Sequence, residues 1–175
     1  MRFPPLAAAL ALAWSSPALA LTLTSHDLTP GGQIAAAHIY PRCGGQNVSP
    51  ELSWSGAPAG TRSFVLTMID LDVKPALWSH WIVADLPPTA TGLARGIKTL
   101  PAGAHAVASN FGEAAYDGPC PPAGSGLHRY ELTIWAMPSA STAIAPDGNA
   151  AQLMARLKGA ALAHASLVGT VTAKP

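Results

Sequence analysis

An aspartate, two histidines and a tyrosine each stand at one end of an apolar run in this 175-residue sequence. They are Asp70, His80, His128 and Tyr130. Imidazole and phenol groups donate hydrogen bonds, which suits an anion. A carboxylate beside an imidazole fixes its tautomer and favours its charged form, so Asp70 is predicted to act from behind His80 and to raise its pKa. These residue types predict a small anion site.

The three apolar runs have the length and composition of core strands. They cover residues 63–69, 82–86 and 128–136. Because side chains alternate between the two faces of a strand, each polar residue is predicted to lie on the apolar face of its own run. The predicted rows are Phe64, Leu66, Met68 and Asp70; His80, Ile82, Ala84 and Leu86; and His128, Tyr130, Leu132, Ile134 and Ala136. If the three strands share a sheet, the four polar groups converge at its end.

Three other uses of these residues compete with anion binding. Asp70 and His80 could form a buried, self-satisfied pair that needs no ligand. Aspartates and histidines also bind zinc or manganese, but the sequence lacks the H-x-x-x-H and E-x-x-H spacings of such sites. Catalysis by a serine is disfavoured because the sequence contains no G-x-S-x-G motif. We therefore expect a site without catalysis, metal or cofactor.

The first 20 residues have the features of a secretory signal peptide. A short basic start precedes an apolar run at residues 6–14, which is too short to span a bilayer, and Ala18-Leu19-Ala20 matches the A-x-A cleavage pattern. We predict cleavage before Leu21 and a mature protein that is periplasmic or secreted. After the leader, no segment approaches the length of a transmembrane helix, so no stable membrane insertion is expected.

Charge and cysteine content limit the partners and cofactors. The formal net charge is +1 with 11% charged residues, which offers no electrostatic footprint for nucleic acid. Cys43 and Cys120 are the two cysteines. In an exported protein an isolated pair favours a disulfide over a metal or redox site, with two free buried thiols as the alternative.

The remainder of the sequence predicts one mostly-β domain over residues 21–175 with one C-terminal helix. Prolines and glycines, 17 and 16 in number, separate short apolar runs, as in strands joined by ordered loops. The irregular segment 89–126 is expected to wall the site. The helix is predicted from Asp147 to His164 with Asp147 or Asn149 as its cap, and a last strand is predicted over 165–172.

Seven short segments, in this order and at this spacing, resemble the phosphatidylethanolamine-binding protein (PEBP) family, and within it the exported bacterial Raf-kinase-inhibitor-like proteins. The segments are 46–50 (Gln-Asn-Val-Ser-Pro), 52–61, 70–72, 78–81 (Trp-Ser-His-Trp), 110–112, 116–122 and 127–130. The resemblance covers residues 21 to about 172 and implies an antiparallel β-sandwich with a small pocket for phosphate or a phosphorylated head group.

Residue by residue, the resemblance implies the lining of that pocket. The lining residues would be Asp70, Trp78, His80, Gly118, Pro121, His128 and Tyr130, with Asp72 and Arg129 at or behind the rim. Backbone N–H groups near Gly118 are expected to donate to the anion. Cys43 and Cys120 also fall where exported relatives carry a cysteine pair.

The sequence departs from the family pattern next to the predicted site. The family commonly reads D-P-D-A-P, whereas residues 70–75 read Asp-Leu-Asp-Val-Lys-Pro, which is expected to loosen the loop and to place Lys74 near the mouth. Ser79 stands where bacterial relatives often carry a second aromatic residue.

Two functions follow. The favoured one is a non-catalytic binding protein for a small anionic or phosphorylated ligand. The alternative is an interaction protein that inhibits a partner enzyme, a kinase or a protease, through the same site. A metal-dependent hydrolase is the least favoured.

Overall fold

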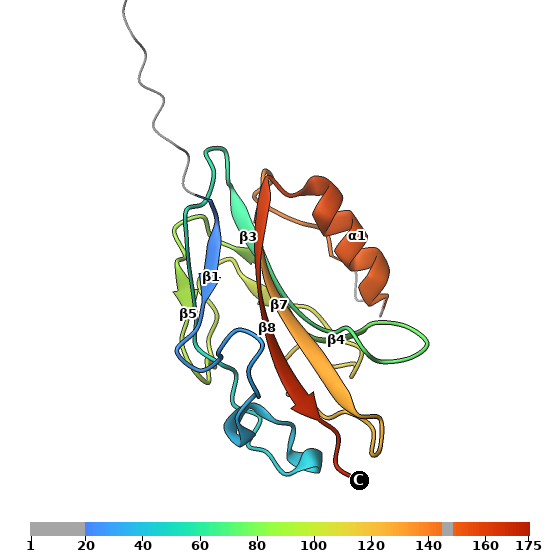
Figure 1. Ribbon diagram of the computed structural model, residues 1–175. Helices are drawn as coiled ribbons and strands as arrows, with labels where there is room; N and C mark the ends of the chain where they lie inside the picture. The colour runs from blue at the N-terminus through green and yellow to red at the C-terminus, as the bar shows by residue number, and fades with distance from the viewer. Residues whose placement is uncertain (1–19, 145–148) are drawn as a thin grey trace, which may run out of the picture.

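Two antiparallel sheets packed face to face form the body of the protein, and one helix covers the outer face of the larger sheet (Figure 1). The computed structural model describes residues 20–144 and 149–175. The smaller sheet has the order β1-β2-β5, with β1 at Thr22–Thr24, β2 at Leu52–Ser55 and β5 at Gly92–Leu93. The larger sheet has the order β6-β4-β3-β7-β8, with β6 at His105–Ala106, β4 at Trp78–Leu86, β3 at Ser63–Asp70, β7 at Leu127–Met137 and β8 at Ala163–Thr172. The predicted single-domain β-sandwich is confirmed.

Three helices complete the described chain. Two short 3-10 helices, η1 at Ala36–His38 and η2 at Pro41–Cys43, lie close together in sequence before β2, and α1 spans Ala150–Ala160. None of the helices within residues 20–144 and 149–175 is long and apolar enough to cross a membrane. The predicted signal peptide, except Ala20, and the predicted cap Asp147 lie outside the described residues.

The main core lies between the two sheets because each sheet turns an apolar face inward. The smaller sheet contributes Leu23, Trp54 and Leu93. The predicted rows of β3 and β7 face them, with Phe64, Leu66 and Met68 on β3 and Tyr130, Leu132, Ile134 and Ala136 on β7. Alternation along the strand therefore gave the correct inward face for β3 and β7.

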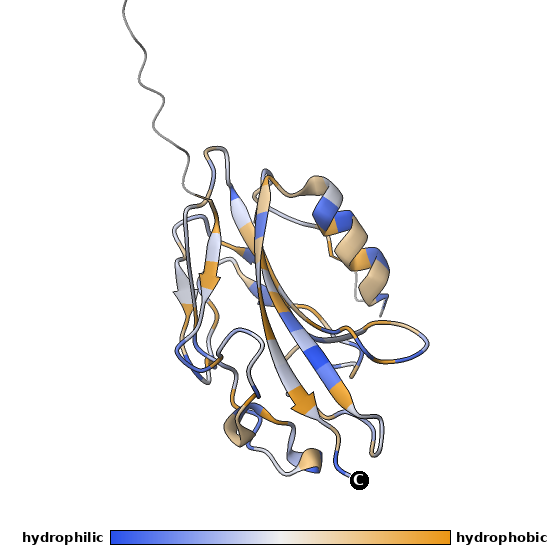
Figure 2. Ribbon diagram, viewed as in Figure 1, coloured by the Kyte–Doolittle hydropathy of each residue, from blue (hydrophilic) through white to orange (hydrophobic). Residues whose placement is uncertain are grey.

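A second, smaller core lies between the larger sheet and α1. Leu153 and Leu157 of the helix pack on Val65 and Trp135 of the sheet. The side chain of Asn149 accepts a hydrogen bond from the backbone of Gln152 at 2.9 Å, so it caps the helix as predicted. In Figure 2 the helix carries both hydrophilic and hydrophobic residues, as expected for an element with one buried side.

The predicted C-terminal end of the helix is wrong by four residues. The helix ends at Ala160, and His164 lies in β8 opposite Trp135 of β7. Pairing of β8 with β7 begins at Ala163, opposite Ala136, so the ladder takes residues that helix periodicity alone would have continued.

The predicted row on β4 is also wrong, because β4 contains two irregularities. Ile82 and Ala84 face the helix side of the sheet, whereas Leu86 lies in the core between the sheets. The register runs from Met68↔Trp81 directly to Ile69↔Ser79, which leaves His80 as an extra residue without a partner on β3. Such a β-bulge bends the strand and redirects its side chains.

Candidate functional site

Three neighbouring strands place their polar ends together at one end of the larger sheet. Asp70, the last residue of β3, pairs with Trp78 at the start of β4 and with Tyr130 near the start of β7. The connection from β3 to β4 and the turn before β7 therefore leave the sheet at the same end. The predicted convergence of the strand ends is what the structure shows.

Asp70 forms its close contact with His128. The Nδ1 atom of His128 lies 2.8 Å from Oδ2 of Asp70, and both side chains are buried. The other carboxylate oxygen of Asp70 accepts the backbone N–H of Asp72 at 2.9 Å. The prediction that Asp70 holds His80 is wrong in this respect, since the carboxylate fixes the tautomer of the second histidine and leaves its Nε2 atom for another partner.

His80 is held by the backbone instead of by a carboxylate. Its Nδ1–H donates to the carbonyl oxygen of Asp117 at 2.8 Å, and only 2% of the residue is exposed. Burial lowers the pKa of His80 below 6.5, although the Asp117 carbonyl and the charge of Asp70 oppose this shift. The predicted rise in pKa is therefore wrong. The bulge explains why the ring lies here, because in a regular ladder His80 would oppose Ile69 and point toward the helix face.

The hydroxyl of Tyr130 is buried near the carboxylate of Asp70 and the backbone of Cys120. Tyr130 is fully buried, and its hydroxyl makes no hydrogen bond of ordinary geometry with the described residues. Burial, then the charge of Asp70 and a contact with its carboxylate outside ordinary hydrogen-bond geometry, raise the pKa of this phenol, so it stays protonated. Its ring meets the ring of His80 edge-on with centroids 5.1 Å apart. Buried polar groups are rarely left without a well-formed hydrogen bond, so this hydroxyl is suited to donate to a further acceptor.

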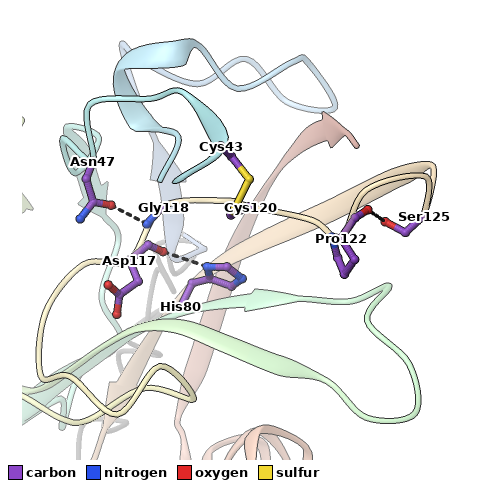
Figure 3. Close-up of a disulfide and its surroundings, with 8 residues drawn as sticks. All are labelled: Cys43, Asn47, His80, Asp117, Gly118, Cys120, Pro122 and Ser125. Carbon is purple, nitrogen blue, oxygen red and sulfur yellow. Dashed lines mark hydrogen bonds between the residues drawn. A yellow bond between two sulfur atoms is a disulfide. The ribbon is translucent and has the colours of Figure 1, made fainter. Parts of the chain in front are cut away.

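The segment around Gly118 is tied to the N-terminal part of the chain (Figure 3). The N–H of Gly118 donates to the side chain of Asn47 at 2.7 Å, so this one N–H group is already engaged, and the expectation for the neighbouring N–H groups stays a prediction. A side chain at Gly118 would overlap the carbonyl of His38, which explains the glycine. The predicted disulfide between Cys43 and Cys120 is present, with the Cα atoms 5.4 Å apart.

Two aromatic residues that sequence reasoning left out of the site form a chain of contacts that starts at His80: Phe111 contacts its ring, and Tyr40 contacts Phe111. Phe111 is 36% exposed, and its ring centroid lies 5.1 Å from that of His80 and 5.8 Å from that of Trp78. Tyr40 stacks on Phe111 with the ring centroids 5.5 Å apart. A large exposed aromatic side chain inside the irregular segment 89–126 was the available signal, and this part of the segment does wall the site.

Ser79 explains how Phe111 is held in place. The backbone and hydroxyl of Ser79 both donate to the side-chain oxygen of Asn110, at 2.7 and 2.8 Å. The backbone N–H of Asn110 donates back to the Ser79 hydroxyl at 2.9 Å. The serine at this position therefore fastens the turn that carries Phe111 to the start of β4.

Asp72 and Arg129 form a separate pair at the surface. The guanidinium of Arg129 donates to both carboxylate oxygens of Asp72, at 2.8 and 2.9 Å. This bond lowers the pKa of Asp72 to about 2. Because its guanidinium is engaged here, Arg129 acts as a brace for the loop after β3, in keeping with its predicted place at the rim.

The remaining predicted residues divide between the site and its surroundings. Pro121 is buried and follows the disulfide, and Trp78 is half-buried beside Phe111. His38 and His164 lie elsewhere, the first bonded to the carbonyl of Val48 and the second stacked on Trp135. Within the described ranges, no three His, Cys, Asp or Glu residues are grouped so that they could hold a metal ion.

Comparison with known proteins defines the class. Residues 24–172 match the model of the phosphatidylethanolamine-binding protein family, and the chain belongs to this family. It is 38% identical over 135 residues to the UPF0098 protein YbcL of Escherichia coli K12, which covers 72% of this chain and 73% of that protein. It is 37% identical over 150 residues to the putative lipoprotein LppC of Mycobacterium tuberculosis H37Rv, which covers 86% of this chain and 71% of that one.

Solved structures agree. The crystal structure of E. coli YbcL, described as a new member of the mammalian PEBP family, superposes with a TM-score of 0.80 at 31% identity and covers 89% of this chain and 98% of that one. A putative PEBP homologue, CT736 of Chlamydia trachomatis, gives a TM-score of 0.72 at 33% identity and covers 87% of this chain and 97% of that one.

Proposed function

We propose that the protein is a non-catalytic binding protein for a small phosphorylated or other oxyanionic ligand, held by His80, His128 and Tyr130. The observation that carries this proposal is the fully buried Tyr130 hydroxyl, which makes no hydrogen bond of ordinary geometry with the described residues and belongs to a ring in contact with both histidine rings. An oxyanion accepts hydrogen bonds from a phenol hydroxyl and from imidazole N–H groups. Asp70 would serve as the positioning group for His128 and would not touch the ligand.

The protonation states determine when the site binds well. With Nδ1–H of His80 bonded to the Asp117 carbonyl, the neutral ring offers a lone pair at Nε2, which repels an anion. Protonation of Nε2 turns it into a donor. Because burial lowers the pKa of His80 below 6.5, the affinity for a permanently charged anion should rise as the pH falls through that pKa.

Access to the site passes the aromatic side chains. His80 and His128 are only 2% and 3% exposed, and Phe111 and Trp78 are the more exposed neighbours of His80. A small anion, or the head group of a larger molecule, would enter beside them. The proposed location is the cell envelope, which the predicted signal peptide, the disulfide and the lipoprotein name of one relative support.

The test is an NMR titration with methanesulfonate, whose charge does not change with pH, and with inorganic phosphate. The amide shifts should map to Gly118, His128 and Tyr130. His80→Gln and His128→Gln should each weaken binding at least about tenfold, because each removes a charge-assisted bond of roughly 1.5–3 kcal/mol. The control is His105→Gln, which removes an exposed histidine on β6.

Two results would contradict the proposal. One is binding in both histidine variants that equals that of His105→Gln. The other is a set of shifts that maps away from the ends of β3, β4 and β7. Turnover of a phosphate or carboxyl ester that is lost in His80→Gln would show instead that the protein is an enzyme.

A further inference from the structure

We infer that the protein has a second binding pocket, for a small amphipathic anion, between the two 3-10 helices and the C-terminal end of β8. The pocket has a volume of about 410 Å³. Its walls include Ile34, Ile39, Pro121 and Val171, and its charged lining residues are Arg42 and Lys174. The inference does not depend on the anion site proposed above.

The walls of this pocket are fixed by backbone hydrogen bonds. Ile34 donates to the carbonyl of Thr170 at 2.9 Å, which joins the segment before η1 to β8. Gly124 donates to the carbonyl of Lys174 at 2.8 Å, which joins the loop after the disulfide to the C-terminal segment. A preformed pocket of this volume falls within the range of small-molecule sites, about 300–1,000 Å³.

The charged residues that line the pocket are all positive. Its lining contains Arg42 and Lys174 and no acidic residue. Within the described part of the chain, neither side chain forms an ion pair or a hydrogen bond. The ammonium of Lys174 lies against Gly44, where an added Cβ atom would be 3.1 Å from it, and Gly44 is two residues from Arg42. Two unpaired cations beside one apolar pocket favour a single carboxylate, sulfonate or phosphate on an apolar body.

The pocket is separate from the proposed anion site. His80, His128 and Tyr130 do not line it. The segment from Asp117 to Pro122 runs between His80 and the Cys43 segment, as Figure 3 shows. Cys43 lines the pocket on one side of this segment, and Pro121 is part of the wall. Apart from Pro121, which the resemblance implied for the anion site, a ligand on an apolar body therefore meets different residues from a free phosphate.

The experiment titrates the full mature protein with octanoate and follows amide shifts by NMR. Shifts should map to Ala36, Gly44, Ala123 and Val171. Arg42→Gln and Lys174→Gln should each weaken binding about threefold and the double variant about tenfold, because exposed charge pairs are worth less than buried ones. Arg62→Gln, which removes an exposed cation beyond the other end of β3, should leave the affinity unchanged.

A blocking variant separates this pocket from the first site. Ala123 is exposed and lines the pocket, so Ala123→Trp should fill it without harm to the fold. It should abolish octanoate shifts and leave methanesulfonate shifts unchanged. A fatty acid and a phospholipid both carry an anionic group on an apolar body, so octanoate is compared with a short-chain phosphatidic acid. The compound that binds more tightly indicates whether the natural ligand is a free acid or a lipid.

Three results would overturn the inference. Equal binding of neutral 1-octanol would mean that the cations play no part. Equal binding of inorganic phosphate would mean that the apolar walls play none. Octanoate shifts that map to His128 and Tyr130, or that persist in Ala123→Trp, would place the ligand in the other site, and this outcome leaves the proposed function intact.

Discussion

At the scale of single residues, the hydroxyl of Tyr130 is expected to lower the stability of the free protein and to strengthen binding of the proposed ligand. A buried hydroxyl without a partner loses its hydrogen bonds to water and gains none in the folded protein, which costs about 1–3 kcal/mol. Tyr130 carries a hydroxyl of this kind on a ring that contacts both histidines. The proposed ligand would supply an acceptor for it.

Tyr130→Phe tests this balance directly. Removal of the hydroxyl should leave the free energy of unfolding unchanged or raise it by about 1 kcal/mol, and should weaken methanesulfonate binding. Urea denaturation and NMR titration measure the two effects. A loss of stability larger than about 1 kcal/mol would mean that the hydroxyl already has a partner in the free protein.

The lowered pKa of His80 predicts how the stability of the fold depends on pH. Because its pKa is lower in the folded protein than in the unfolded chain, the unfolded chain binds the proton more readily. The stabilising effect of neutral His80 is therefore present above pH 6.5 and is lost as the pH falls toward the folded pKa. Asp117, whose pKa burial raises, contributes with the opposite sign and is present in every variant.

Urea denaturation across this pH range checks the sign. Wild-type protein should lose stability below pH 6.5 more steeply than His80→Gln, whose side chain can still donate to the Asp117 carbonyl. Parallel curves for the two proteins would show that the pKa of His80 is not lowered by folding.

At the scale of elements, alternation along the strands predicted most of the fold, but it failed for β4 because this strand contains a β-bulge. The apolar runs gave β3, β4 and β7, and the convergence of their polar ends followed. The orientation of His80 could not follow, because period-two counting assumes a regular ladder and no residue in 78–86 marks the extra position between Met68↔Trp81 and Ile69↔Ser79. The partner of Asp70 depends on the same irregularity.

The end of the helix escaped prediction for a related reason. Residues 160–163 read Ala-Ala-Leu-Ala and contain no helix breaker, so the boundary is set by β8 pairing with β7 and not by local preference. Phe111 was missed because its role arises from a turn that Ser79 and Asn110 fasten across 31 residues of sequence.

The packing of α1 gives a prediction for the helix itself. Leu157 is buried against the larger sheet, so Leu157→Ala should lower the free energy of unfolding by about 2–5 kcal/mol, as is typical of such truncations. The adjacent Lys158→Ala is the exposed control and should change it little. Because the helix lies on the face away from His128, anion affinity should be unchanged in both; a loss of affinity in Leu157→Ala alone would indicate coupling between the two faces.

At the scale of the whole molecule, the disulfide joins parts of the chain 77 residues apart. Closure of a loop of this length stabilises a fold by roughly 4 kcal/mol in the chain-entropy model. The double variant Cys43→Ser/Cys120→Ser should lose stability by about that amount, as measured by urea denaturation. A loss below about 1 kcal/mol would mean that the hydrogen bonds that join Asn47 to Tyr116 and Gly118 already fix the two segments.

The Cys43–Cys120 disulfide also makes ligand binding depend on whether a given copy of the protein is oxidised. The covalent tie holds the segment that carries Asp117 and Gly118, and this segment positions His80 on one side and the amphipathic pocket on the other. A newly made copy in a reducing compartment would lack the tie, and we expect it to bind either ligand poorly. If the protein is exported and binds ligands as proposed, oxidation would act as a maturation step that confines binding to the time after export.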